Sequence, residues 1–484
     1  MVSPRLAALT VVALFVAGCS GSGDGVTTST GSVTPPMTET TAPPVTETTV
    51  PPTTETTGLP VIIDTDVALD DAMAILYLLR RPDIEIVAVT VSGTGVAYCD
   101  AGVAIVLGLL AVGGEDQVPV ACGAEIPLEG ANAFPKAWRG AMDTIAASGV
   151  FPPGGNPVTD DAPSLIATAV SESPAPPVIL VLGPHTNLAQ ALRDHPDLAS
   201  EIAAIHLMGG AVEAAGNTFD NPRAEWNLWI DPVADAEVFA TDIPVSIVPL
   251  DATAAVPLTT WFADRLAEHL TTPEAQAVHD LLTADPTTLS SGLSFWDQLA
   301  AVTLVESAVA TWQELDVTVL QQGGPENAGT LAAGMGRPAT VAMAADREAF
   351  ESEYLSTLTG EEVAASEWDT DATLTVSDAG WDYDGPITVE PGLFTVIVDN
   401  QSEQSVVVVH GWLIGDATWE DLDAYSGSGI EQPPFLEVAG FALADPRIET
   451  IWTIDFSRSG QNALIGLDLG LEEMVWSLEV VVDG

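Results

Sequence analysis

The sequence predicts an α/β domain with a mostly parallel sheet covered by helices, followed by a smaller all-β sandwich domain. From residue 58 to residue 366, short apolar runs rich in β-branched residues alternate with segments of helical spacing. From residue 370 to residue 484, alternating apolar and polar segments are separated by Gly, Pro and Asn, which is typical of a β-sandwich, expected here to be antiparallel. The length of 484 residues also favours more than one domain.

Residues 1–19 have the form of an export signal. Arg5 precedes an apolar run from Leu6 to Val16, which is too short to span a bilayer as an anchor. The segment ends in Val-Ala-Gly-Cys and resembles the lipobox of bacterial lipoproteins, in which the cysteine is lipid-modified. We therefore expect Cys19 to carry a lipid that anchors the exported protein to the outer face of the bacterial cell membrane. An ordinary signal peptide cut nearby is the alternative.

Residues 20–57 consist mainly of Thr, Pro, Ser, Gly and Glu, with almost no large apolar side chain. Such a segment cannot bury enough surface to offset the entropy lost on ordering. It is predicted to be a disordered linker that holds the rest of the chain away from the membrane.

The charge balance excludes one class of partner. The chain has a net charge of −57, from 69 acidic and 12 basic residues, and Lys136 is its only lysine. Such a surface repels polyanions, so we expect no binding to nucleic-acid polymers and no membrane binding through a basic patch.

The alternation in the first domain predicts its elements in order. The first strand covers Val61–Ile63 and is followed by a helix with apolar residues at helical spacing. Further strands are expected at 84–91, 118–121, 178–182, 202–208 and 245–249, and further helices at 101–111, 163–170 and 188–193.

Four aspartates stand where the first strand gives way to its helix. They are Asp64, Asp66, Asp70 and Asp71. Like charges at such short spacing resist ionising together, so a cation among them is the simpler arrangement, and Ca²⁺ accepts several carboxylate oxygens. The alternative is that Asp70 and Asp71 only cap the helix, which would account for two of the four acids.

Five motifs carry a resemblance to a known family. They are DTDVALDD, LGPHTN, LMGG at Leu207–Gly210, AEWNLWIDP at Ala224–Pro232 and FWDQLAAV at Phe295–Val302. In their order and spacing they resemble the inosine-uridine-preferring nucleoside hydrolases. The resemblance implies calcium-dependent hydrolysis of the N-glycosidic bond of a small-molecule ribonucleoside to free base and ribose. Members of that family often form dimers or tetramers, so a homo-oligomer is compatible with the resemblance, but the sequence shows no interface and leaves the oligomeric state open.

The resemblance assigns roles to individual residues. Asp66, Asp71, Asp297 and the backbone carbonyl of Leu182 would bind calcium, and Asp66 would also accept a proton from the attacking water. The ribose-binding residues would be Asp70, Asn217, Glu225 and Asn227, with Met208 lining the pocket and Asp64 as a supporting hydrogen-bond partner. Such a set suits a reaction that builds positive charge on the sugar. Taken alone, Glu225 and Asn227 could be surface polar groups and Asp297 a helix N-cap.

Trp296 is the most informative departure from the family pattern. Inosine-uridine-preferring members have a histidine at this position that helps the base to leave, whereas purine-specific relatives look similar to this chain. A tryptophan can stack on a base, so we expect a purine preference, with Trp138 on the opposite face of the base. The alternative for both tryptophans is packing in a core.

Smaller departures affect other positions. Val67-Ala68 replaces the usual Pro-Gly between the acids, and Ser92-Gly93-Thr94-Gly95 follows the second strand where many members have an asparagine. The segment from Gly216 to Ala224 is longer than its commonest form. His185 is interpreted as structural, and His279 either as a leaving-group acid or as a helix-surface histidine.

Two other functions remain open from the sequence. One is a lipoprotein that binds nucleosides without turnover. The other is a haloacid-dehalogenase-like phosphatase, whose nucleophile motif also resembles DTD after an apolar strand. Such phosphatases need a downstream lysine, and Lys136 lies in a Pro- and Trp-containing segment without the expected helix start.

The remaining expectations concern cysteines and copper. With Cys19 lipidated, Cys99 and Cys122 are left, and an exported pair can form a disulfide, although the sequence does not show that they meet. The final region resembles cupredoxin-like domains of exported bacterial proteins, on the pattern YDGPITVEPGLFTVIVDNQS. It contains His410 and no cysteine, so no copper site is predicted.

Overall fold

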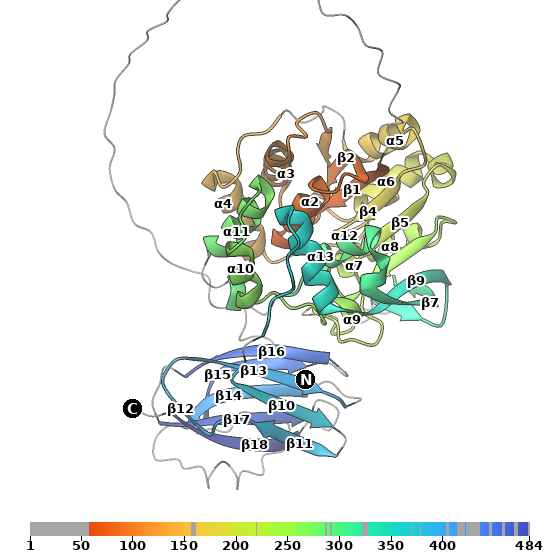
Figure 1. Ribbon diagram of the computed structural model, residues 1–484. Helices are drawn as coiled ribbons and strands as arrows, with labels where there is room; N and C mark the ends of the chain where they lie inside the picture. The colour runs from red at the N-terminus through yellow and green to blue at the C-terminus, as the bar shows by residue number, and fades with distance from the viewer. Residues whose placement is uncertain are drawn as a thin grey trace, which may run out of the picture. The chain divides into compact units, whose positions relative to one another are not determined.

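The computed structural model describes the chain from residue 58 onward (Figure 1). The residues it does not describe are 1–57, 156–160, 219, 286–287, 291–292, 322–327, 369, 378, 403–405, 414–421, 423–435, 445–447, 457–459, 469–472 and 483–484. The predicted export signal, Cys19 and the predicted linker therefore lie outside the described residues. Within the described part of the chain, no helix combines the length and apolarity needed to cross a membrane.

A nine-stranded sheet organises the first part of the chain, in the order β3-β2-β1-β4-β5-β6-β9-β7-β8. Its strands are β1 (Leu59–Thr65), β2 (Ile84–Val91), β3 (Val120–Cys122), β4 (Val178–Val181), β5 (Ala204–Met208), β6 (Val245–Val248), β7 (Ala310–Val319), β8 (Leu331–Ala333) and β9 (Arg337–Ala345). The pairs from β3 to β9 are parallel, and the pairs that β7 makes with β9 and β8 are antiparallel. The predicted mostly parallel sheet is confirmed.

Helices cover both faces of this sheet. Along β1, Val61 and Ile63 belong to one apolar core and Ile62 to the other, because successive side chains of a strand point to opposite faces. The helices on the first face include α2 (Leu69–Leu79), α3 (Cys99–Gly113), α10 (Thr260–Ala267), α11 (Pro273–Ala284), α12 (Trp296–Val305) and α13 (Arg347–Thr359). Those on the second face include α5 (Ala162–Glu172), α6 (Thr186–Asp194) and α8 (Pro232–Phe239).

Not every helix near the site was predicted. Helix α4 (Lys136–Ser148) begins after Pro135, so Lys136 does stand at a helix start, and the expectation that it does not was wrong. Only Arg139 and Met142 of this helix are buried. With so few buried positions, α4 lacks the apolar periodicity by which the other helices could be recognised. The side chain of Lys136 is exposed.

Two smaller sheets follow. One has the order β11-β10-β13-β16 and the other β12-β18-β17-β14-β15. Their strands are β10 (Ala372–Ser377), β11 (Gly380–Asp384), β12 (Thr388–Val389), β13 (Leu393–Asn400), β14 (Val406–Leu413), β15 (Leu436–Ala444), β16 (Ile448–Asp455), β17 (Gly460–Asp468) and β18 (Glu473–Val482).

Strands of both smaller sheets share one apolar core, as expected for a sandwich. The expectation of a purely antiparallel arrangement was wrong, since β10 pairs with β13 and β12 with β18 in parallel. His410 is buried in this region, and its Nε2 atom lies 3.0 Å from Oδ1 of Asn462.

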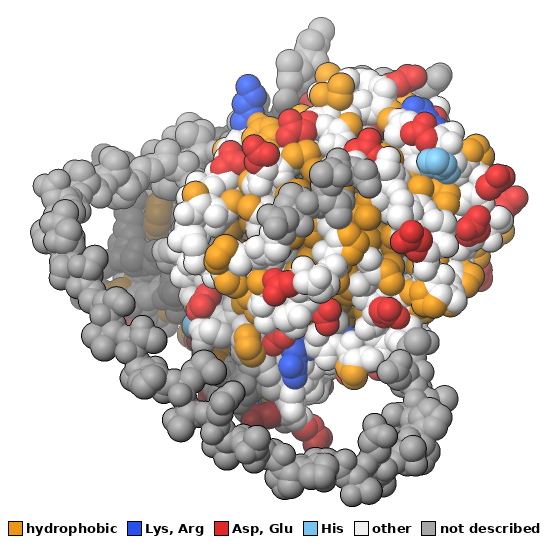
Figure 2. All heavy atoms as spheres, turned by 90° about the horizontal axis from the view of Figure 1, so that it is seen from above, with side chains coloured by type: hydrophobic (Ala, Val, Ile, Leu, Met, Phe, Trp, Pro, Cys, Tyr) orange, Lys and Arg blue, Asp and Glu red, His pale blue; other side chains and the backbone are white. Residues whose placement is uncertain are grey.

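Acidic side chains are scattered over the face of the molecule shown in Figure 2 and outnumber the basic ones there. They are not gathered into a single patch on this face. This distribution agrees with the net charge of −57.

Candidate active site

The acidic residues lie at the point where the strand order reverses. The chain runs outward from β1 through β2 to β3 and then returns to β4 on the other side of β1. In open α/β sheets, ligands bind outside the carboxyl ends of the strands at such a switch point. Asp66 follows the carboxyl end of β1, and Leu182 follows that of β4.

The loop after β1 has an unusual backbone. Val67 has a φ of 60°, and it is the only non-glycine residue with a positive φ among those described. A β-branched residue in this region is strained, and such strain persists only where the surroundings hold it. Here the Val67 side chain is fully buried in the apolar core, which compensates for the strain.

Asp71 holds this loop in place from the first turn of α2. Its Oδ1 atom accepts hydrogen bonds from the Thr65 hydroxyl and from the Asp66 backbone N–H (3.1 Å), and its Oδ2 atom accepts from the Ala68 N–H (2.9 Å). The last of these bonds caps the helix, so the capping interpretation holds in part for Asp71. The same bonds fix the direction in which Asp66 leaves the strand.

Three carboxylates form a compact group. Asp70, Asp71 and Asp297 each offer an oxygen, and these atoms lie within 4.8 Å of one another. Asp297 comes from the first turn of α12, where Phe295 is the N-cap residue, so the alternative that Asp297 caps this helix was wrong. Its Oδ1 atom is buried and has no hydrogen-bond partner among the described residues. The predicted ligand set contained Asp66 and not Asp70. In the structure, Asp66 borders the group formed by the other three aspartates.

The electrostatics of the group favour a cation. Burial raises the pKa of Asp66 and of Asp297 well above the usual value, and the charges of Asp71 and Asp70 raise both further. Burial and then the charge of Asp71 raise the pKa of the partly exposed Asp70 to about 8. A hard divalent ion relieves this repulsion, so the donor set fits Ca²⁺ or a similar ion.

Leu182, Met208 and Asn227 meet on the other side of the switch point. The side-chain amide of Asn227, on α7 (Trp226–Ile230), lies 3.4 Å from the carbonyl oxygens of both Leu182 and Met208 and 3.6 Å from the sulfur of Met208. All three residues are buried. The sequence motifs that contain them, far apart along the chain, thus converge on one place.

Glu225 is the N-cap of α7 and is buried, so the alternative of a surface polar group was wrong for it and for Asn227. Its carboxylate accepts from the backbone N–H groups of Asn227 (2.8 Å) and Gly210 (3.1 Å). Burial raises the pKa of Glu225 to about 7, although these hydrogen bonds oppose the shift. Asn217 joins the same corner, because its Oδ1 atom accepts from the Trp226 N–H at 3.1 Å.

The side chain of Asp64 lies in a buried hydrogen-bond network. Its Oδ1 atom accepts from the Thr90 hydroxyl and from the Asn187 amide, both at 2.8 Å. Burial raises its pKa to about 7. These contacts agree with the supporting role expected of Asp64.

Aromatic side chains border the site. Trp226, between Glu225 and Asn227, has its ring centroid 5.1 Å from that of Phe134 and 5.3 Å from that of Trp138. Trp138 is 42% exposed, so core packing does not account for it. Trp296, the first residue of α12, packs partly buried against the apolar core beside Asp297.

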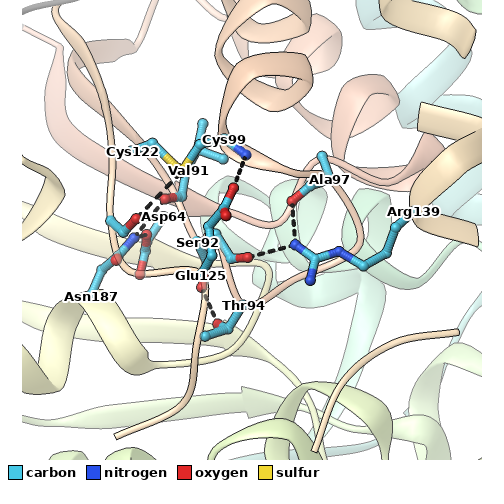
Figure 3. Close-up of a disulfide and its surroundings, with 12 residues drawn as sticks. Asp64, Val91, Ser92, Thr94, Ala97, Cys99, Cys122, Glu125, Arg139 and Asn187 are labelled. Atoms are coloured by element: carbon cyan, nitrogen blue, oxygen red, sulfur yellow. Dashed lines mark hydrogen bonds between the residues drawn. A yellow bond between two sulfur atoms is a disulfide. The ribbon is translucent and has the colours of Figure 1, made fainter. Parts of the chain in front are cut away.

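Cys99, at the start of α3, and Cys122, at the end of β3, form a disulfide with a Cα–Cα distance of 5.6 Å (Figure 3). The structure thus shows that the two cysteines meet, which the sequence left open. The bridge ties the end of the loop that follows β2 to the neighbouring strand.

The structure shows the surroundings of His185 and His279. His185 is fully buried, with its Nδ1 atom 2.7 Å from Oδ1 of Asp235, and burial lowers its pKa to about 4. His279 lies on α11 and is partly exposed, with its Nδ1 atom 3.7 Å from Asp280. A structural role for His185 agrees with this burial.

Sequence reasoning missed Arg139, Phe134 and Trp226. Arg139 stands beside Trp138 in AFPKAWRG, and Trp226 stands between the two predicted ribose-binding residues. The position of an arginine and of aromatic residues next to candidate site residues could have indicated that they belong to the site. Their partners lie up to 92 residues away along the chain, which a local pattern does not reveal.

A family model described as inosine-uridine preferring nucleoside hydrolase matches residues 61–352. Among curated proteins, the pyrimidine-specific ribonucleoside hydrolase RihA of Citrobacter koseri is 36% identical over 206 residues, which are 40% of this chain and 61% of that protein. RihA of Salmonella arizonae is 35% identical over 195 residues, with the same coverage. The chain thus spans about 61% of the length of these curated relatives.

Solved structures agree with these matches. A plant nucleoside hydrolase has a TM-score of 0.56 and 26% identity, covering 63% of this chain and 99% of its own. An inosine-guanosine nucleoside hydrolase has a TM-score of 0.53 and 26% identity, covering 62% and 99%. The inosine-uridine preferring enzyme of Bacillus anthracis, at 23% identity and a TM-score of 0.55, shows the same fold. The chain therefore belongs to the inosine-uridine preferring nucleoside hydrolase family.

Proposed function

We propose that this protein hydrolyses the N-glycosidic bond of ribonucleosides and releases the free base and ribose. The observation that carries the proposal is the convergence of Asp66, Asp70, Asp71 and Asp297 at the switch point of the sheet, beside Glu225 and Asn227. Membership in the nucleoside hydrolase family supports it. The substrate is a small nucleoside, because the net charge of −57 disfavours nucleic-acid polymers.

The residues that would hold the metal are Asp66, Asp71, Asp297 and the carbonyl group of Leu182, and the ion that suits this oxygen donor set is Ca²⁺. Asp70 is close enough to Asp71 and Asp297 to contribute as well. When bound, such an ion lowers the pKa of a coordinated water and neutralises the carboxylate charges.

Asp66 would act as the general base. Its Oδ2 atom accepts from the Val96 N–H at 3.3 Å, and the backbones of Gly95 and Gly183 lie against its side chain. Because burial raises its pKa, Asp66 is better suited to accept a proton near neutral pH than an exposed aspartate. The water oxygen would bond to the anomeric carbon, its proton would pass to Asp66, and the electrons of the broken C–N bond would leave with the base.

The ribose would be held by Asp70, Glu225, Asn227 and Asn217, with Met208 lining the pocket. Cleavage builds positive charge on the sugar ring, which nearby carboxylates stabilise. Glu225 and Asn227 are held on the short helix α7 by backbone hydrogen bonds, so little ordering is needed when the sugar binds.

We propose in addition a preference for purine bases. Its support is Trp296 beside Asp297, at the position where inosine-uridine-preferring members have a histidine, together with the exposed ring of Trp138 as a second stacking surface. The curated relatives cited above are named as pyrimidine-specific, which makes uridine the decisive competitor substrate.

The proposal includes an extracellular location. The lipoprotein signal in residues 1–19, with Cys19 as the lipid-modified residue, would place the enzyme on the outer face of the bacterial membrane. Residues 20–57 would act as a linker, 58–366 as the hydrolase domain and 370–484 as a separate sandwich domain. The Cys99–Cys122 bridge supports this location, because disulfides persist in oxidising compartments.

The test is chromatographic detection of base and ribose from inosine, guanosine, adenosine and uridine. We expect all products to depend on Asp66, with Asp66→Asn lowering kcat by at least ~10²-fold, since general bases typically contribute that much. Asp116→Asn, which removes an exposed acid, serves as the control and should leave kcat unchanged. Uridine cleaved with a higher kcat/KM than inosine would contradict the purine preference, and no cleavage of any nucleoside would contradict the function.

A further inference from the structure

The loop from Ser92 to Cys99 forms a close support for Asp66. The N–H of Val96 donates to the Asp66 carboxylate at 3.3 Å, and the N–H of Ala97 donates to the Asp66 carbonyl at 2.9 Å. A Cβ atom at Gly95 would lie 2.0 Å from the Cβ of Asp66. The position of the Asp66 carboxylate therefore follows the position of this loop.

Arg139 of α4 holds the loop from outside. Its Nη2 atom donates to the carbonyl oxygens of Gly93 (2.7 Å) and Ala97 (3.3 Å). Figure 3 shows the bond to Ala97. The guanidinium carbon also lies 3.8 Å from the ring centroid of Tyr98. Arg139 is 5% exposed and is the only arginine or lysine among the buried residues described. These partners are neutral and belong to the loop that contacts Asp66.

The same helix carries Trp138 on its exposed side. Trp138 lies against Trp226, which is flanked by Glu225 and Asn227. Apart from Arg139, only Met142 of α4 is buried. The two hydrogen bonds that Nη2 of Arg139 donates thus link the helix that bears Trp138 to the loop that supports Asp66.

We propose that Arg139 is a positioning residue that fixes the Gly93–Ala97 loop against Asp66 and, through α4, holds Trp138 opposite Trp226. The inference rests on the proposed function, because it assigns Asp66 and Trp138 to the reaction and to the base. Both hydrogen bonds start from one nitrogen, Nη2, and the planar guanidinium also lies over the ring of Tyr98. The ammonium group of lysine does not reproduce this stacked contact.

The test compares three variants of the full chain. Arg139→Met removes the guanidinium but keeps an apolar stem, Arg139→Lys keeps the charge, and Lys136→Met removes a charge from an exposed position on the same helix. Circular dichroism and thermal unfolding identify the folded fraction, and kcat and KM for inosine are given per folded molecule. Amide hydrogen exchange of the peptide that contains residues 92–99 reports on the loop independently of activity.

We expect Arg139→Met to lower kcat by ~10- to ~100-fold, since small displacements of a catalytic group have effects of this size, and to raise KM as Trp138 moves. Exchange in residues 92–99 should become faster. Arg139→Lys should recover part of kcat, and Lys136→Met should match the wild type in every readout. A merely structural role would lower the folded fraction and leave kcat and KM per folded molecule unchanged.

Two outcomes separate the proposals. If the wild type cleaves inosine and Arg139→Met has wild-type kcat, KM and exchange, Arg139 has no positioning role. If the wild type cleaves no nucleoside, the proposed function fails, and the exchange measurement alone decides whether Arg139 fixes the loop.

Discussion

Gly95 illustrates how little room surrounds Asp66. The 2.0 Å separation between a Cβ atom at Gly95 and the Cβ of Asp66 means that any side chain at this position displaces either the loop or the aspartate. Asp66 is 3% exposed and packed on both sides by glycine backbone, so it has no free direction in which to move. The absence of a side chain at Gly95 is thus a requirement of the site.

Gly95→Ala is predicted to lower kcat by ~10²-fold, because a misplaced catalytic group loses about that much. It should also lower the free energy of unfolding by about 1–3 kcal/mol, as overpacking does. The matched control is Gly140→Ala in α4, where an added Cβ meets nothing within 4 Å. That change should raise the stability by about 0.5–1 kcal/mol at unchanged kcat. A Gly95→Ala enzyme with wild-type kcat would show that Asp66 is not held by this loop.

The sequence pattern could predict which acidic residues belong to the site, but not the role of each. The run DTDVALDD indicated a cation site from charge spacing alone. In the folded chain, Asp64 accepts hydrogen bonds from Thr90 and Asn187, whereas Asp71 holds the loop. These contacts form only in the fold, so the sequence does not show them. The positive φ of Val67 could not be predicted either, because valine rarely adopts this conformation.

At the scale of elements, the disulfide between α3 and β3 limits how far the supporting loop can move. The bridge closes a segment with a sequence separation of 23 residues. The bridge also lies at one end of the Ser92–Cys99 loop. At the other end, the Ser92 hydroxyl donates a hydrogen bond to the Pro184 carbonyl oxygen at 3.1 Å. The loop is therefore fixed at both ends.

The double variant Cys99→Ser/Cys122→Ser is predicted to lose about 3 kcal/mol of unfolding free energy, the size expected for a crosslink of this span. It should also show faster amide exchange in the loop and a lower kcat. Wild-type protein treated with a reductant is the control and should behave in the same way. Equal denaturant midpoints for the oxidised, reduced and variant chains would refute a stabilising role.

Elements with strong periodicity were predicted to within about two residues. Strand β2 was expected at 84–91 and lies at Ile84–Val91, since most of its apolar residues are β-branched and its second half is buried. Helix α4 was missed because the partners that stabilise it are loop carbonyls and aromatic rings rather than a core of its own. The parallel pairing of β10 with β13 depends on which strands meet, and a local pattern does not encode that.

At the scale of the molecule, the site gathers part of the chain's net charge of −57 into one buried group of carboxylates. The pKa is raised to about 7 at Asp64 and Glu225 and to about 8 at Asp70, chiefly by burial, from ordinary values of 3.8 for Asp and 4.5 for Glu. Between about pH 4 and pH 8 the folded chain thus holds protons that the unfolded chain has released. Stability without a bound cation therefore falls as pH rises through this window, and protons compete with a cation for the same carboxylates.

The most direct test of the account is ribose release from inosine during a calcium titration of the chelated full chain, at pH 8 and at pH 6.5. We predict no release after chelation, full recovery on adding Ca²⁺, and a higher calcium concentration at half-maximal rate at pH 6.5, because more of the site is protonated there. Asp297→Asn should require more calcium at both pH values, since Asp297 belongs to the acidic group. Full activity of the chelated chain at both pH values, with no metal found by elemental analysis, would contradict the account.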